Sequence, residues 1–379
     1  MQTEPTPVVL NDSRRIWTDV ASLILLALLL HSAAAADLQT RNLFLVTTDG
    51  LRWQELFGGA DAGLLNEAHG GVKNTNTLQR QFWRETHETR REALMPFFWS
   101  VIATQGQVLG NTNIGSAATV INGLNFSYPG YNELLAGIAD PRIDSNEKRP
   151  NPNLTVLEWL NGQPGFQNRV AAFAAWDVFP YILNRDRSGI HVRAGWEPMA
   201  TGEMNPARTL LNQLIAETTP TWESVTYDSF VFRGALDYLL ETQPRVLYLA
   251  LGETDDWAHE GRYDHYLESA HRVDRYLQIL WETIQSIPQY KDRTTVLITT
   301  DHGRGSGLED WKSHGEKIPG SEYIWIAAIG PDTRPLGVRR DVAPVTQAQV
   351  AATVAAFLGK DFTLAVPAAA ASIDLLIAR

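Results

Sequence analysis

Acidic and imidazole side chains follow three separate apolar runs of the sequence, and one more histidine comes later in the chain. Carboxylate oxygens and imidazole nitrogens are metal ligands, and several imidazoles favour zinc, or manganese or iron, over magnesium and calcium, which prefer oxygen. Three carboxylates and three imidazoles suit two divalent cations better than one. The candidate ligands are Asp49 in "LFLVTTDG", Asp255 and His259 in "ETDDWAH", Asp301 and His302 in "VLITTDHG", and His314 in "KSHGEK".

Each of these residues has an ordinary structural interpretation when it is taken alone. An aspartate after a strand, such as Asp49, is often a helix N-cap. Asp255 and His259 are four residues apart and could be an exposed pair on one helix face, and His314 could be any surface histidine. Asp301, His302 and the glycine after them are less common together, because glycine lets the backbone approach closely. Their joint occurrence in this order favours a functional site.

The elements that must position these side chains alternate along the chain. We expect strands at residues 43–47, 170–174, 245–251, 294–299 and 323–328, and helices at 78–104, 206–217, 229–241, 265–287 and 347–358. This alternation predicts an α/β fold, a three-layer sandwich with a mostly parallel central sheet. Ligands of such a sheet bind beyond the carboxyl ends of its strands, where the candidate ligands would converge. Residues 125–153 are expected to be a long ordered loop near that edge.

Composition narrows the possible functions. The 379 residues are 44% hydrophobic and carry a formal net charge of -11. A nucleic acid polymer is not an expected partner, because binding a phosphate backbone requires clustered Lys and Arg. A small anionic substrate remains compatible with the charge. The chain has no cysteine, so it has no disulfide, no thiolate metal ligand and no cysteine nucleophile.

The N-terminus has the pattern of an export signal. Arg14 and Arg15 precede an apolar run at residues 20–30 and small residues at 32–36. We therefore expect residues 1–36 to be a cleaved signal peptide and residues 37–379 to be a single catalytic domain in the periplasm or outside the cell. The apolar run is short for a bilayer span, so no stable membrane span is expected. An uncleaved N-terminal anchor is the alternative.

Taken together, the motifs resemble those of the alkaline phosphatase superfamily, in particular its nucleotide pyrophosphatases and phosphodiesterases, sulfatases and cofactor-independent phosphoglycerate mutases. The likeness runs in order from about residue 42 to residue 315: "TTDGLR" is similar to the first metal-ligand motif, "ETDDWAH" to Glu-x-Asp-x-x-x-His, "TTDHGRG" to Asp-His-Gly, and "SHGEK" to the closing His-Gly element. The resemblance implies an alkaline phosphatase-like domain with two metal sites, one held by Asp49, Asp301 and His302 and the other by Asp255, His259 and His314.

Members of this superfamily carry a nucleophile between the first two metal motifs. In "LGNTNIGSAAT" the resemblance selects Thr112, which would also be a metal ligand, with Asn111 as a neutral donor beside it. A shifted alignment would select Ser116 instead. A threonine alcohol is a poor nucleophile at neutral pH, and coordination to a divalent cation favours its alkoxide.

The resemblance implies an exported two-metal hydrolase of phosphate monoesters or diesters. Without a cysteine the usual precursor of the sulfatase cofactor is absent, so a sulfatase-like esterase that uses Ser116 is an alternative, and a catalytically inactive metal- or anion-binding homologue is another. Tyr128, Tyr131, Trp176 and Phe179 could line a substrate pocket or only pack the fold. Arg304 and Lys312 could contact the substrate. Glu253 is a further acidic residue in "ETDDWAH", after the same apolar run as Asp255 and His259. The leaving group and the oligomeric state are not indicated.

Overall fold

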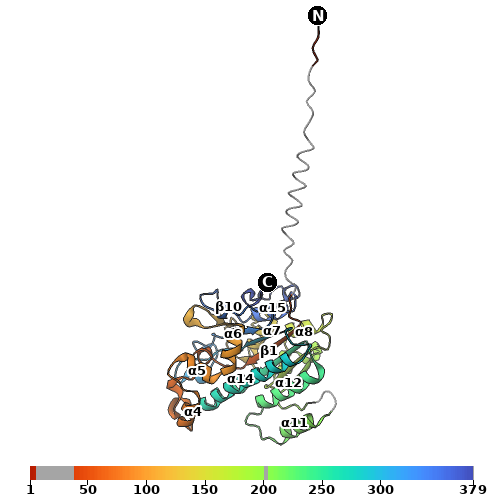
Figure 1. The fold of residues 1–379 in the computed structure, drawn as a ribbon. Coiled ribbons are helices and arrows are strands. Elements are labelled where there is room, and N and C mark those ends of the chain that lie inside the picture. The colour runs from red at the N-terminus through yellow and green to blue at the C-terminus, as the bar shows by residue number, and fades with distance from the viewer. Residues whose placement is uncertain (6–37, 200–203, 379) are drawn as a thin grey trace. The chain divides into compact units, whose positions relative to one another are not determined.

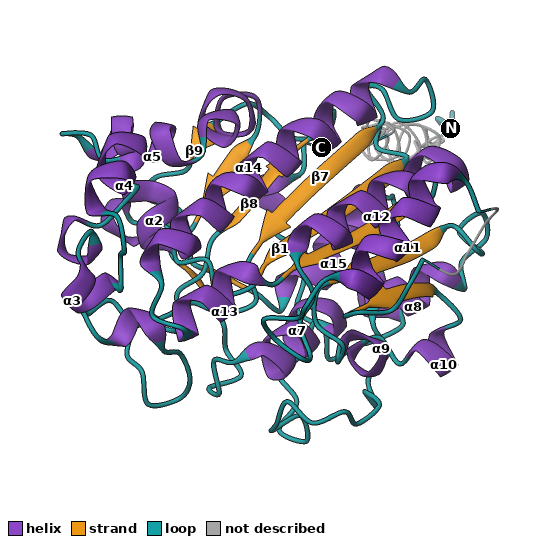
Figure 2. Ribbon diagram, turned by 90° about the horizontal axis from the view of Figure 1, so that it is seen from below, coloured by secondary structure: helices purple, strands orange, loops and turns teal. Residues whose placement is uncertain are grey.

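The computed structural model describes residues 1–5, 38–199 and 204–378. The predicted signal peptide at residues 1–36 therefore lies almost wholly outside the described residues. Residues 38–378 belong to one compact unit, built around a central sheet (Figures 1 and 2). None of the helices in the described part of the chain is both long and apolar enough to span a membrane.

The central sheet has eight strands within the described residues, in the order β5-β4-β6-β1-β7-β8-β2-β9. Its pairs are parallel except β7 with β8 and β8 with β2. The strands are β1 (Asn42–Thr48), β2 (Gln107–Leu109), β4 (Val170–Ala174), β5 (His191–Ala194), β6 (Val246–Leu251), β7 (Thr294–Thr299), β8 (Ile326–Ile329) and β9 (Gly337–Val338). A second, small sheet pairs β3 (Ala118–Thr119) with β10 (Val345–Thr346).

Helices cover both faces of the sheet (Figure 2). The α-helices are α2 (Trp53–Gly58), α3 (Glu67–Gly70), α4 (Thr75–Phe82), α5 (His87–Leu94), α6 (Ala103–Gln105), α7 (Ser127–Ala136), α8 (Val156–Asn161), α9 (Phe179–Ile182), α10 (Arg185–Ser188), α11 (Pro206–Glu217), α12 (Asp228–Thr242), α13 (Glu253–His259), α14 (Tyr263–Ser286) and α15 (Gln349–Phe357). A π-helix covers Phe98–Ile102, and short 3-10 helices include Thr112–Ile114 and Asp310–Lys312.

Alternate residues of each central strand face opposite sides, which produces two hydrophobic cores. Phe44 and Val46 of β1 join one core with α2, α5, α12 and α14. Leu43 and Leu45 join the other core with α7, α8, α9 and α15. The predicted three-layer sandwich with a mostly parallel sheet is therefore confirmed.

The predicted elements agree with the structure unevenly. Four strands were placed to within one residue at each end, because they are nearly continuous apolar runs that the sheet buries on both faces. The single helix predicted over residues 78–104 is wrong: the chain breaks there after Phe82, where Thr86 caps α5 by accepting a hydrogen bond from the amide of Thr89, and again before Pro96. The loop predicted over residues 125–153 is also wrong at its start, which is the helix α7.

Candidate metal centre

The three central strands bring the predicted ligands together. Strand β1 lies between β6 and β7, and all three run in the same direction. Asp49 directly follows β1, helix α13 with Asp255 and His259 follows β6, and Asp301 with His302 follows β7. The carboxyl ends of neighbouring parallel strands meet at one edge of the sheet, and the ligands converge there as predicted.

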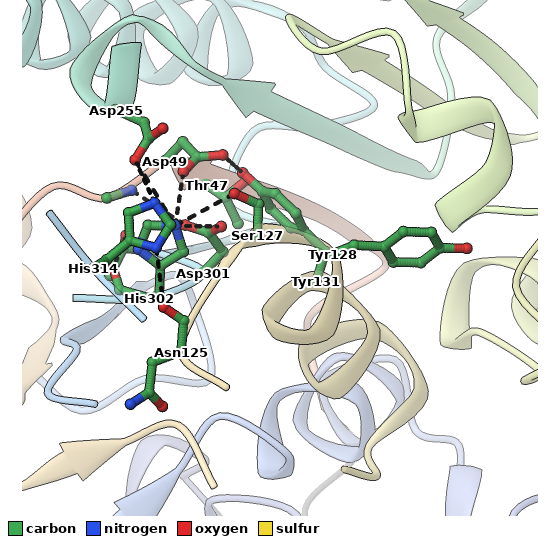
Figure 3. A network of polar contacts seen from close by, with 12 residues as sticks. Thr47, Asp49, Asn125, Ser127, Tyr128, Tyr131, Asp255, Asp301, His302 and His314 are labelled. Atoms are coloured by element: carbon green, nitrogen blue, oxygen red, sulfur yellow. Dashed lines mark hydrogen bonds and ion pairs between the residues drawn. The ribbon is translucent and has the colours of Figure 1, made fainter. Parts of the chain in front are cut away.

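The side chains of Asp49, Asp301 and His302 form the first group, which we call the Asp49 position. Their ligand atoms lie within 4.8 Å of one another. The Nε2 atom of His302 is 3.3 Å from Oδ1 of Asp49 and 3.4 Å from Oδ2 of Asp301 (Figure 3). Nδ1 of His302 donates to the carbonyl of Gly303 at 2.9 Å, so in the neutral ring Nε2 carries a lone pair.

Two oxygens of the Asp49 position are buried and have no hydrogen-bond partner among the described residues. They are Oδ1 of Asp49 and Oδ2 of Asp301, the same atoms that approach Nε2 of His302. Buried acceptors without donors are costly. A divalent cation among these three atoms would satisfy all of them, so the residues present fit a metal ion.

The electrostatics of the Asp49 position also favour a bound cation. Burial, with the neighbouring charge of Asp255, raises the pKa of Asp49 to about 7. Burial together with Asp49 raises the pKa of Asp301 well above its usual range. Burial also lowers the pKa of His302 to about 4, which leaves a neutral imidazole at neutral pH. Carboxylates held this way are stabilised as anions when a cation binds beside them.

The second group, which we call the Asp255 position, contains Asp255, His259 and His314. Nε2 of His259 lies 3.0 Å from Nε2 of His314 and 3.2 Å from Oδ2 of Asp255. Nδ1 of His314 donates to the carbonyl of Asn125 at 3.1 Å, which turns its Nε2 toward the cluster (Figure 3). His302 stands between the two groups, because its ligand atom also lies within 4.8 Å of those of Asp255 and His314.

The residues predicted to form the nucleophile segment, Asn111, Thr112 and Ser116, come just after β2 in the chain. Thr112 begins a 3-10 helix that Asn111 caps by accepting from the amide of Asn113. Ser116 is fully buried and accepts from the amide of Gly110 at 3.2 Å. Among the described residues, no hydrogen bond joins Thr112, Asn111 or Ser116 to the candidate ligands. They follow β2, which is separated from β1 by β7 and β8.

A different hydroxyl lies at the cluster. Ser127, the first residue of α7, is 6% exposed, and its Oγ is 3.4 Å from Nε2 of His302 (Figure 3). Helix α7 is fixed against the ligands, because Tyr131 donates to Oδ2 of Asp49 at 2.8 Å. A Cβ on Gly130 would lie only 2.4 Å from the carbonyl oxygen of Asp301, so glycine is needed there. The sequence signal for this helix start is a serine with a proline two residues later, because proline is tolerated in the first turn of a helix.

The remaining predicted residues have structural surroundings. Tyr128, Tyr131 and Phe179 are at most 2% exposed and pack the core, while Trp176 is half-buried. Glu253 accepts from the amide of Asp228 at 2.9 Å and from the hydroxyl of Ser269 at 3.2 Å, with Arg272 as its ion-pair partner, and so joins α13 to α12 and α14. Lys312 pairs with Glu309 near the surface, and the buried guanidinium of Arg304 pairs with Asp255.

Comparison with known proteins identifies the fold. No family model matches the sequence, and no curated protein is similar to it at the sequence level. Solved structures do match. A mutant of alkaline phosphatase PafA is 11% identical with a TM-score of 0.55, over 91% of this chain and 100% of that one. A phosphonate monoester hydrolase from Silicibacter pomeroyi is 13% identical with a TM-score of 0.54, over 89% and 76%.

A lipoteichoic acid synthase from Listeria monocytogenes is 11% identical with a TM-score of 0.52, over 85% of this chain and 72% of that one. The chain shares the fold of these solved structures, an α/β sandwich like that of alkaline phosphatase PafA. At these identities the likeness concerns the path of the chain. The chemistry of this alkaline phosphatase-like chain has to be argued from its own side chains.

Proposed function

We propose that the chain is a metal-dependent hydrolase of phosphate monoesters or diesters in which Ser127, rather than Thr112, is the nucleophile. The observation that carries the proposal is the convergence of two unpartnered carboxylate oxygens, from Asp49 and Asp301, and the Ser127 hydroxyl around Nε2 of His302. Hydrolase names among the structural relatives support the reaction class.

Asp49, Asp301 and His302 would hold one divalent cation, and Asp255, His259 and His314 a second. Three imidazoles favour zinc, with manganese or iron as the next choices. Such ions supply Lewis acidity, which stabilises the alkoxide of a coordinated hydroxyl and the charge of a phosphoryl group. The carboxylates of the two positions carry three negative charges, so two dications would leave a site that a phosphoryl anion can enter.

The remaining steps belong to the chain itself. Ser127 lies at the N-terminus of a ten-residue helix, where the positive end of the helix dipole favours an alkoxide and an incoming anion. Attack of its Oγ on phosphorus forms a phosphoserine as the bond to the leaving alcohol breaks, and the alcohol departs with a proton. Water then hydrolyses the phosphoserine and restores the hydroxyl. Tyr131 holds the carboxylate of Asp49 throughout by its hydrogen bond.

The test compares three hydroxyl variants on nitrophenyl phosphate monoesters and diesters. Ser127→Ala should lower turnover at least about 1000-fold while circular dichroism and bound metal stay as in the parent, because the nucleophile acts only in the chemical step. Thr112→Ala and Ser116→Ala are the matched controls and should stay within about threefold. Full activity of Ser127→Ala together with an inactive Thr112→Ala would contradict the proposal and identify Thr112 as the nucleophile.

The same assay separates the alternatives. Preferential turnover of a nitrophenyl sulfate would favour the sulfatase-like reaction, and no turnover of any ester at any metal loading would favour an inactive binding homologue. We further infer export, because the apolar run and alanines before residue 37 have the pattern of a cleavable signal. Mass spectrometry of exported protein should find a chain that begins near Asp37, and a chain that still contains Arg14 would indicate an anchor.

A further inference from the structure

Arg304 is a fixed cation whose ion pair, within the described part of the chain, is with a ligand of only one of the two candidate metal positions. Its side chain is 1% exposed. Nη1 donates to the carbonyl of Lys312 at 2.7 Å, and Nη2 donates to the carbonyl of Asp255 at 3.0 Å and to Oδ1 of the same residue. Two backbone carbonyls therefore hold the guanidinium in place, so it is not a movable surface counter-ion.

The two positions differ in which oxygens are already satisfied. At the Asp49 position, Oδ1 of Asp49 and Oδ2 of Asp301 are buried and have no hydrogen-bond partner among the described residues. At the Asp255 position Oδ1 of Asp255 already accepts a hydrogen bond from the guanidinium of Arg304. An incoming cation relieves unsatisfied acceptors at the first position and competes with existing partners at the second.

The local charges differ in the same direction. When they are ionised, the carboxylates of the Asp49 position carry two negative charges without a neighbouring cation in direct contact, whereas Arg304 neutralises the single charge of Asp255. In a buried site such charges are weakly screened by solvent. The guanidinium of Arg304, fixed against Oδ1 and the carbonyl of Asp255, already stabilises this carboxylate before any metal ion arrives.

We propose that Arg304 makes the two positions unequal, so that the first metal ion binds at Asp49, Asp301 and His302 and the Asp255 position fills only at higher free metal concentration. The proposal rests on the metal dependence proposed above. In this view Arg304 is a positioning residue that keeps the Asp255 carboxylate in place and lowers the affinity of its position for a second cation.

The experiment strips the full-length protein with a chelator and titrates it with Zn²⁺ in competition with a fluorescent zinc indicator, while elemental analysis gives the stoichiometry. The parent should bind two ions with dissociation constants at least about tenfold apart. Arg304→Gln removes the charge and should bring the two constants to within about threefold by tightening the second. Arg304→Lys keeps the charge and is the matched control, which should preserve the gap.

A further variant, Asp301→Asn, assigns the steps to positions: it should lose the tight step and keep the weak one. Two equal steps in the parent, loss of the weak step in Asp301→Asn, or a folded Arg304→Gln whose gap is unchanged would overturn the inference and leave the proposed function standing. Binding of no ion by the parent would overturn both. If Arg304→Gln does not fold, closure of the gap in Arg304→Lys would still contradict the proposal, because that variant retains the charge.

Discussion

At the scale of single residues, the candidate metal centre includes side chains that contact a candidate ligand but are not ligands themselves. Tyr131 is the clearest case, because its hydroxyl donates to Oδ2 of Asp49 while Oδ1 of that carboxylate faces His302. Hydrogen bonds of this kind orient metal ligands. From the sequence, Tyr131 is expected only to line a substrate pocket or to pack the fold. A side chain that acts by orienting another residue has no sequence motif of its own.

Tyr131→Phe should weaken zinc binding at the Asp49 position by about tenfold, since it removes the hydrogen bond and keeps the packed ring. Competition with a zinc indicator measures the change. Tyr128→Phe is the control on the same helix: its hydroxyl donates to the carbonyl of Arg149 at 2.6 Å, away from the ligands. Equal zinc affinity of the parent and Tyr131→Phe would show that packing alone places Asp49.

At the scale of elements, α7 connects the candidate metal centre to two other parts of the fold. The buried carboxylate of Glu133 accepts from the amides of Ile121 and Asn122 and from the amide of Ala348, just before α15. One side chain thus ties α7 to the segment before it and to the start of a distant helix.

Glu133→Gln should lower the free energy of unfolding by about 1–3 kcal/mol, because the new amide nitrogen donates hydrogen bonds and would face amide donors that need an acceptor. Urea denaturation followed by circular dichroism measures the loss. An unchanged midpoint and slope would mean that these amides find other acceptors.

A second element-scale prediction concerns pH and strand β5. His191 packs on Tyr238 with ring centroids 4.7 Å apart, and its Nε2 has no hydrogen-bond partner among the described residues. Burial, with the nearby charge of Arg185, lowers the pKa of His191. The folded chain therefore binds this proton less readily than the unfolded chain, and stability present above about pH 6.5 is lost as the pH falls.

His191→Phe keeps an aromatic ring at this place and cannot take up a proton. Its free energy of unfolding should fall less steeply than that of the parent between about pH 7.5 and pH 5. Denaturation curves at several pH values measure both slopes. Parallel slopes would contradict a role for His191 in the acid sensitivity of the fold.

The elements also show how far the sequence could predict the centre. The convergence of the candidate ligands that follow β1, β6 and β7 could be predicted, because apolar runs mark buried strands and residues after parallel strands share an edge. The sequence does not single out Ser127, the nucleophile proposed above, because Pro129 and Gly130 interrupt the helical pattern of α7. Gly130 is needed for close approach to the carbonyl of Asp301, and a contact between segments so far apart in the chain leaves no local signal. Thr112 is predicted from the resemblance of its segment to the superfamily's nucleophile motif, and in the structure this segment forms a short 3-10 helix.

At the scale of the whole molecule, a buried centre with unsatisfied carboxylates should make stability depend on metal. Removal of divalent ions with a chelator should lower the melting temperature by several degrees, because a ligand that binds only the folded chain stabilises it. Zn²⁺ should restore the melting temperature, and Mg²⁺ or Ca²⁺ should not, because of the imidazoles. Asp301→Asn should respond less to Zn²⁺, and a parent indifferent to the chelator would contradict the prediction.

The ligands of the centre begin at Asp49 and end at His314, and they meet only after β6, β1 and β7 have paired. An unfolded chain therefore has no binding site for the ion, whatever its sequence. If the chain crosses a membrane unfolded, it meets its metal in the compartment where it folds. If it crosses folded, the metal ions available in the cytoplasm determine which ion it carries. Under the proposed export, the route of transport would determine which metal ion the folded chain carries, so zinc content measured in protein purified from another compartment would describe the ions of that compartment.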